Sequence, residues 1–184
     1  MVVSSAANSR TFIVTTPSDH EIRMTRLFDA PRHLVFDAFT KPDLLTRWYG
    51  ARGWTLISCE VDLRVGGGWR FVSQGPDGAQ MGQSGVYQAI EPSDRLVYTE
   101  LFDHQSYPGE SLIDHEFVER DRKTTLTSTL RFATAEGRDI VLRYPMRRGV
   151  AEGFDRLADL LDRIQADRLD HMQADQPGHG LDHD

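Results

Sequence analysis

The sequence predicts an α+β protein in which a curved antiparallel sheet of about six to seven strands wraps around a long C-terminal helix. Between residues 54 and 132, most segments alternate apolar and polar residues and are separated by short turns, a pattern typical of consecutive β-hairpins. From Pro145 onward, apolar residues recur three or four positions apart, which indicates one long amphipathic helix. The apolar face of the sheet needs a cover, and this helix is the only large element available.

One strand and two short helices precede the hairpins. Residues 21–28 alternate in the manner of a strand. Asp29 can then cap a helix whose first turn contains Pro31 and whose apolar residues continue to Phe39. A second short helix is expected over residues 42–48.

Turns rich in glycine, proline and aspartate separate the remaining strands. Gly66, Gly67 and Gly68 lie between the first two of them and allow a tight reversal, because glycine adopts positive φ without steric cost. Asp62 and Arg64, just before this turn, are interpreted as a structural charge pair. The expected strands span residues 54–65, 69–74, 83–90, 95–102, 112–119 and 124–132.

Length and composition indicate a single domain of 184 residues and exclude several classes of function. The 21 basic and 28 acidic residues give a net charge of −7, which argues against a nucleic-acid partner, because such binding needs a clustered basic surface. The single cysteine, Cys59, allows no internal disulfide and no zinc cluster, and it is interpreted as an inert strand residue. No apolar run approaches the roughly 20 residues of a membrane span, and the N-terminus lacks the features of a secretory signal. A cytoplasmic protein with no membrane partner, no metal and no organic cofactor is expected, and its exposed sheet edges would permit a homodimer.

A series of short motifs extends over most of the chain. These are residues 28–31 (FDAP), 35–39 (VFDAF), 47–50 (RWYG), 61–67 (VDLRVGG), 85–87 (GVY), 95–100 (RLVYTE) and 148–154 (RGVAEGF). With them the chain resembles the START-like (SRPBCC, helix-grip) superfamily. Within it, the chain is most similar to the bacterial branch named for the activator of heat-shock protein 90 ATPase, near the polyketide cyclase/dehydrase group.

The resemblance implies a START-like domain over residues 21–168. A partly disordered extension would precede it over residues 1–20, and a disordered acidic tail would follow over residues 169–184. Members of this superfamily typically enclose an apolar cavity between sheet and helix. The function implied first is therefore binding of a small, largely apolar molecule there, without an assigned reaction.

Two other functions are compatible with the resemblance. One is a cofactor-independent enzyme of the cyclase/dehydrase kind, acting on an aromatic or polyketide-like substrate. The other is a chaperone cofactor or protein-interaction module. The chain differs from many relatives at position 100, where it has glutamate after Thr99 and they carry tryptophan.

Strand alternation predicts polar residues on the inner face of the sheet. If Glu119 lies opposite Thr124 across the last hairpin turn, His115 lies opposite Ser128, and the apolar neighbours of both share one face. Ser128 lies within a strand and lacks the sharp turn and oxyanion donors of a hydrolase nucleophile.

A third polar residue, Glu100, is expected on the neighbouring strand. Pairing Phe102 with Ile113 would set Glu100 opposite His115 and so form a row with Ser128. Glu100 and His115 would then be the candidates for proton transfer, and the row could also anchor a polar group of a ligand. The alternative is an internal polar network, or a Glu100 that reaches solvent.

The remaining candidates are apolar and aromatic residues that would form the cavity wall, for which plain core packing is the alternative. Gly149 and Gly153 would let the terminal helix approach the sheet or leave space for a ligand. The residues expected to contact a ligand are Trp48, Tyr49, Trp69, Phe71, Tyr98, Glu100, Phe102, His115, Ser128, Met146, Val150 and Phe154.

Overall fold

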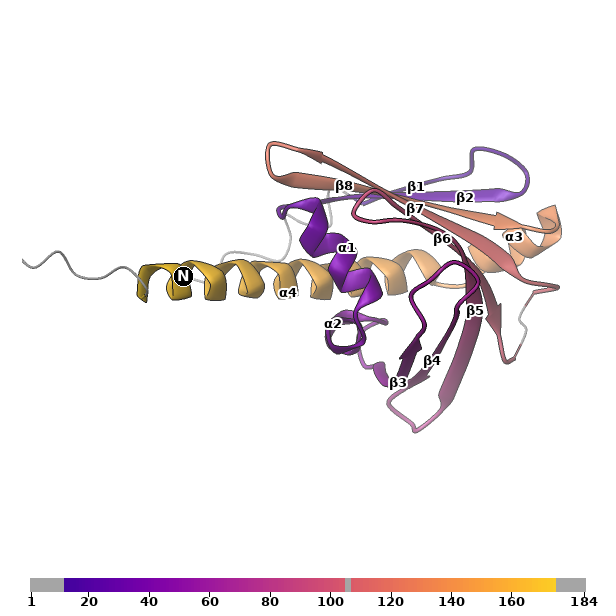
Figure 1. Ribbon diagram of the computed structural model, residues 1–184. Coiled ribbons are helices and arrows are strands. Elements are labelled where there is room, and N and C mark those ends of the chain that lie inside the picture. Colours follow the sequence, from indigo (N-terminus) through magenta and orange to yellow (C-terminus); the bar gives the residue numbers. More distant parts are fainter. Residues whose placement is uncertain (1–11, 105–106, 175–184) are drawn as a thin grey trace, which may run out of the picture.

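The computed structural model describes residues 12–104 and 107–174, which form an antiparallel sheet curved around a long helix (Figure 1). The strand order is β1-β2-β8-β7-β6-β5-β4-β3. The strands are β1 (Ile13–Thr15), β2 (Glu21–Phe28), β3 (Thr55–Val61), β4 (Gly68–Gln74), β5 (Gln80–Glu91), β6 (Arg95–Phe102), β7 (Ser111–Arg120) and β8 (Lys123–Phe132). The helices are α1 (Arg32–Thr40), α2 (Pro42–Trp48), α3 (Ala135–Arg143) and α4 (Met146–Ala174).

The hydrophobic core lies between the concave face of the sheet and α4. Helix α1 packs against β7, β8 and α4, and α2 packs against β3 and α4, so the two short helices close one side of this space (Figure 1). Alternate residues of β2 and β8 enter the core, and α4 contributes Phe154, Leu157, Leu160 and Leu161. The helix-grip architecture predicted from the hydrophobic periods is therefore confirmed.

Two elements escaped sequence prediction because neither carries a periodic apolar pattern. Strand β1 is only three residues long. Helix α3 buries only Gly137, and its one local signal is Thr134, whose side chain accepts a hydrogen bond from the Gly137 N–H at 3.1 Å. Helix α4 continues to Ala174, so residues 169–174, assigned to a disordered tail, are helical; residues 175–184 lie outside the described part of the chain.

The start of α1 corrects the prediction that Asp29 is its cap. Pro31 occupies the N-cap position and offers no side-chain acceptor, while Asp29 lies two positions further from the helix and pairs with Lys123 at 3.3 Å. The Arg32 N–H donates instead to the Glu119 carboxylate of β7 at 2.9 Å. A residue distant in sequence therefore satisfies the free helix terminus.

The glycine run forms a wider connection than a tight two-residue turn. Only Gly66 has positive φ, at 81°, and a side chain on Gly67 would overlap the Asp62 carbonyl oxygen. The turn also pairs with β5, since the Gly66 N–H donates to the Tyr87 carbonyl at 2.8 Å. The predicted charge pair is present, with Arg64 Nε 2.9 Å from the Asp62 carboxylate on the surface.

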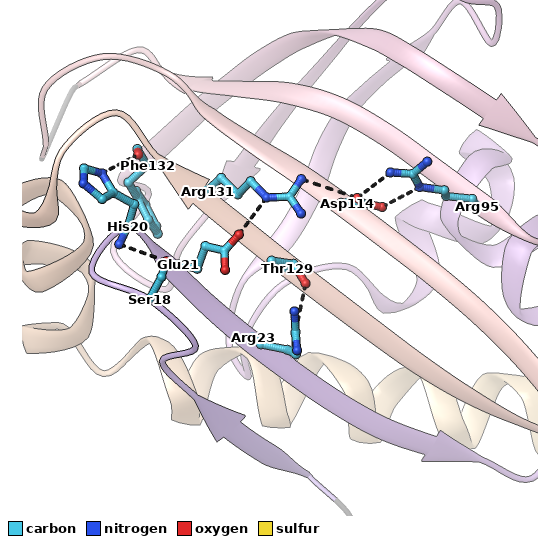
Figure 2. A network of polar contacts seen from close by, with 9 residues as sticks. All are labelled: Ser18, His20, Glu21, Arg23, Arg95, Asp114, Thr129, Arg131 and Phe132. Atoms are coloured by element: carbon cyan, nitrogen blue, oxygen red, sulfur yellow. Dashed lines mark hydrogen bonds and ion pairs between the residues drawn. The ribbon is translucent and has the colours of Figure 1, made fainter.

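A network of polar and charged side chains extends across the face of the sheet opposite the core (Figure 2). Asp114 accepts two hydrogen bonds from Arg95, at 2.9 and 2.7 Å, and lies 3.6 Å from Arg131. Arg131 in turn donates to Glu21 at 2.8 Å. The bonds from Arg95 hold the pKa of Asp114 below its usual value. This network ties β2, β8, β7 and β6 together on the face away from the core.

No helix in the described part of the chain combines the length and the apolar character needed to cross a membrane.

Candidate functional site

A cavity of about 650 Å³ lies between the concave face of the sheet, α2 and the first turns of α4. Every residue that the sequence predicts to contact a ligand lines it. Residues that sequence reasoning missed also line it, among them Gln83, Tyr87, Tyr107, Val141 and Tyr144. Tyr107 and Tyr144 lie in connections between elements, where no periodicity indicates which side chains point inward.

Aromatic rings form much of the cavity wall. The indole N–H of Trp48 donates to the Ala38 carbonyl at 2.8 Å, and that of Trp69 donates to the Thr99 carbonyl at 3.2 Å. Both indoles are therefore oriented by backbone acceptors, which leaves their apolar surface for packing and for the cavity. The Tyr98 ring packs edge-on against Trp69 with 5.3 Å between centroids.

A chain of hydrogen bonds crosses the inner face of three strands. His115 Nε2 lies 2.9 Å from the Tyr98 hydroxyl, and His115 Nδ1 lies 2.7 Å from Ser128 Oγ. Burial lowers the pKa of His115 to about 4, so the ring is neutral at neutral pH, with one nitrogen donating and the other accepting. The predicted opposition of His115 and Ser128 in β7 and β8 is confirmed.

The predicted opposition of Glu100 and His115 is wrong. Tyr98, not Phe102, lies opposite Ile113, so β6 is displaced by four residues (102 against 98) and Leu96 faces His115. The connection from β6 to β7 is long enough to allow either register. Because the displacement is an even number, every side chain keeps its face, and Glu100 still lines the cavity.

Glu100 is surrounded by protein and has no partner in the part of the chain that the structure describes. No described residue donates a hydrogen bond to its carboxylate or forms an ion pair with it, and burial alone raises its pKa to about 7. Burial raises the pKa values of Tyr49, Tyr98 and Tyr107, and the charge of the nearby Glu100 carboxylate raises them further. The side chain keeps some accessible surface, as expected for a group that faces a hollow.

Two of these tyrosines are held by their own hydrogen bonds. Gln83, which is almost fully buried, donates its side-chain amide to the Tyr49 hydroxyl. The Tyr107 hydroxyl lies 3.3 Å from Ser111 Oγ, and Ser111 is the residue opposite Glu100 in the sheet. The rings near the carboxylate are thus fixed in place by neighbouring elements.

Gly149 and Gly153 allow α4 to approach another segment closely, as predicted. That segment is the loop after α2 and not the sheet. A side chain at Gly153 would meet the Gly50 carbonyl oxygen at 3.2 Å. Arg156 donates to the carbonyls of Gly50 and Trp54 at 3.3 and 3.1 Å, which ties the same loop to α4. Gly50 and Gly153 both line the cavity, so this junction forms part of its wall.

Neither metal binding nor thiol chemistry finds support in the described residues. No group of three or more histidine, cysteine, aspartate or glutamate side chains in the described ranges could hold a metal ion. Cys59 lies in β3, and burial raises its pKa to about 11, so the thiol stays protonated at neutral pH.

A sequence profile for the Activator of Hsp90 ATPase homolog 1-like protein family matches residues 29–162. The chain belongs to this family. A protein from Rhodobacter sphaeroides of known structure is 30% identical to it and superposes with a TM-score of 0.79, over 83% of this chain and 99% of that chain. The family assignment confirms the START-like fold indicated by the sequence motifs.

Two proteins of known structure with lower sequence identity share the fold. A protein from Nitrosomonas europaea is 23% identical, with a TM-score of 0.74 over 82% of this chain and 99% of that chain. An HSP90 activator from Plasmodium falciparum is 24% identical, with a TM-score of 0.50 over 67% of this chain and 84% of that chain. A comparison with curated proteins returned no match. Family membership thus establishes the fold, and any ligand has to be inferred from the side chains that line the cavity.

His115 offers a direct test of how dry this cavity wall is. We expect its imidazole to remain neutral down to about pH 4 in an NMR titration, because burial opposes the charged form. The unfolded chain binds this proton near pH 6.5, so the contribution of His115 to stability falls as the pH drops from about 6.5 to 4. Ser128→Ala should leave the pKa low, since burial and not this hydrogen bond lowers it. A His115 imidazole that titrates near pH 6.5 would contradict the prediction, because it would show that the ring is accessible to water.

Proposed function

We propose that the protein binds a small, largely apolar molecule in the cavity between the sheet and α4. The observation that carries the proposal is the cavity itself, about 650 Å³ of space lined mainly by aromatic and aliphatic side chains with a few polar groups. Small-molecule sites have this size and composition. Protein cores, by contrast, pack with few voids larger than a water molecule.

The experiment measures uptake of a neutral aromatic probe, 1-naphthylmethanol, by isothermal titration calorimetry. We expect one site per chain, and native mass spectrometry of freshly purified protein should show any carried ligand. Val150→Phe adds a ring to the α4 wall of the cavity and should block uptake. The matched control is Leu169→Phe, at an exposed position of the same helix away from the cavity. A protein that carries no ligand and binds no aromatic probe would overturn the proposal.

A cyclase/dehydrase-type reaction is the second candidate, and Glu100 is the observation that favours it. A carboxyl group with a pKa of about 7 can give or take a proton at neutral pH. His115 is a weaker partner for it than the sequence predicts, because its two nitrogens are engaged by Tyr98 and Ser128 and its pKa is about 4. A role as a chaperone cofactor would rest on the family match and on fold similarity to the Plasmodium falciparum HSP90 activator, without support from a described side chain.

A further inference from the structure

In the described lining of the cavity, Glu100 supplies the one carboxylate. None of the residues in this lining is lysine or arginine. An anionic ligand would therefore enter without a permanent cation to neutralise it, whereas a cationic ligand would meet Glu100. The sign of the charge in the cavity discriminates between ligand classes even though its wall is mostly apolar.

The surroundings of Glu100 match what a cation needs. Its carboxylate accepts no hydrogen bond from a described residue, so its acceptor sites are available to a ligand. The neighbouring rings of Tyr49, Tyr98 and Tyr107 lie close enough to feel its charge. Aromatic faces attract cations through their quadrupole, most strongly where water is excluded.

The other titratable groups of the cavity do not change this balance. His115 is neutral above about pH 4, and it is hydrogen-bonded on both sides. His104 lies in the exposed connection after β6. The remaining groups are tyrosines. Burial raises the pKa values of Tyr49, Tyr87, Tyr98 and Tyr107 and keeps these phenols protonated, whereas Tyr144 is exposed.

We propose that the ligand is an amine, with an apolar body in the aromatic part of the cavity and a protonated nitrogen on the Glu100 carboxylate among the three tyrosine rings. This inference rests on the proposed function and specifies its ligand class. A charge-assisted hydrogen bond is roughly twice as strong as a neutral one, so an amine gains more from Glu100 than an alcohol of the same shape. A carboxylic acid of the same shape should bind more weakly than the alcohol, because its carboxylate would be repelled by the Glu100 carboxylate.

The test compares three probes that share one ring system: 1-naphthylmethylamine, 1-naphthylmethanol and 1-naphthoate. Their affinities are measured by calorimetry at pH 8, where Glu100 is mainly ionised, and at pH 5.5, where it is mainly protonated. The amine is protonated at both pH values. We expect it to bind about tenfold more tightly than the alcohol at pH 8, with most of this preference lost at pH 5.5.

Two variants assign the preference to Glu100. Glu100→Gln keeps the shape of the side chain and should remove the preference for the amine at pH 8 while the alcohol still binds. Glu60→Gln removes the same charge from an exposed site on β3 outside the cavity and should keep the preference. Because His104 is present in both variants, a pH effect that persists in Glu100→Gln would belong to another group and would overturn the assignment.

The outcomes separate the two proposals. Binding of the alcohol without preference for the amine, or tighter binding of the naphthoate, overturns the amine inference and leaves the proposed function intact. Failure of all three probes, together with the absence of a carried ligand in native mass spectrometry, overturns both. Preference for the amine in the wild type and in Glu60→Gln, lost in Glu100→Gln, supports both.

Discussion

Replacing Asp155 with alanine is expected to destabilise the protein by about 3 kcal/mol, although alanine favours helices. Arg26 of β2 points into the core with none of its side chain exposed, and its Nη2 lies 2.8 Å from Asp155 Oδ1 on α4. Its Nε and Nη1 atoms find no hydrogen-bond acceptor among the described residues. Removing Asp155 would therefore leave a buried guanidinium without the one counter-ion it has among the described residues.

The prediction is checked by urea titration of the variant and the wild type, which gives the free energy of unfolding of each. Asp159→Ala is the matched control, because Asp159 lies four residues further along α4 and is exposed. Both changes gain the same helix propensity, so their difference isolates the buried pair. Equal stability of the two variants would contradict the prediction.

A double substitution distinguishes a specific pair from general packing. Arg26→Met with Asp155→Ala replaces both charges by apolar groups and should recover most of the stability that Asp155→Ala loses, since an apolar pair of similar volume often equals a buried ion pair. Failure to recover would indicate that the Arg26 side chain contributes mainly through its packing, for example against the Phe28 ring 5.7 Å from its guanidinium.

Arg26 also shows where sequence reasoning stops. Alternation in β2 puts Arg26 on the same face as Ile22 and Met24, and in the structure this face is buried. Its partner lies on the terminal helix, and the period of that helix indicates only that Asp155 is not on the apolar stripe. Which polar residue of α4 meets which strand depends on the rotation and height of the helix over the sheet. Neither quantity is encoded in a local pattern.

Some features of the candidate site could likewise be predicted from local patterns, and others could not. The part of the cavity wall that lies on strands and on α4 could largely be predicted, because these residues face inward by a local period of two or 3.6. The register of β6 on β7 could not, because the connection between them does not set it, whereas the tight turn between β7 and β8 does. Tyr107 was missed since a loop residue has no period, although its ring is nearly fully buried beside Phe132.

Glu100→Gln is expected to stabilise the ligand-free protein by up to about 3 kcal/mol at pH 8, an estimate that follows from the rise of the Glu100 pKa from 4.5 to about 7. Between these two pH values the folded protein holds a proton on Glu100 that the unfolded chain has released. Stability is therefore lost as the pH rises through this window, and glutamine, which cannot ionise, escapes the loss.

Urea titrations at pH 4.5 and pH 8 test this prediction. The advantage of Glu100→Gln should shrink to below about 0.5 kcal/mol at pH 4.5, where the carboxyl is protonated in the fold and only partly ionised in the unfolded chain. Glu60→Gln removes a charge from the exposed surface of β3 and should show no comparable gain at pH 8. A Glu100→Gln variant no more stable than wild type at pH 8 would mean that water in the cavity solvates the carboxylate.

Glu100 is expected to lower the stability of the folded protein and has no partner among the described residues. Strongly perturbed groups of this kind cluster at functional sites, so we infer that Glu100 serves a ligand. Glutamine would fill the same space without lowering the stability of the folded protein at pH 8. An ammonium group bound to Glu100 would make glutamate more favourable than glutamine at this position, because a nearby cation favours the ionised carboxylate and lowers its pKa. With 1-naphthylmethylamine at saturation and pH 8, the wild type should therefore gain more stability than Glu100→Gln. The same side chain would thus weaken the empty protein and strengthen the complex.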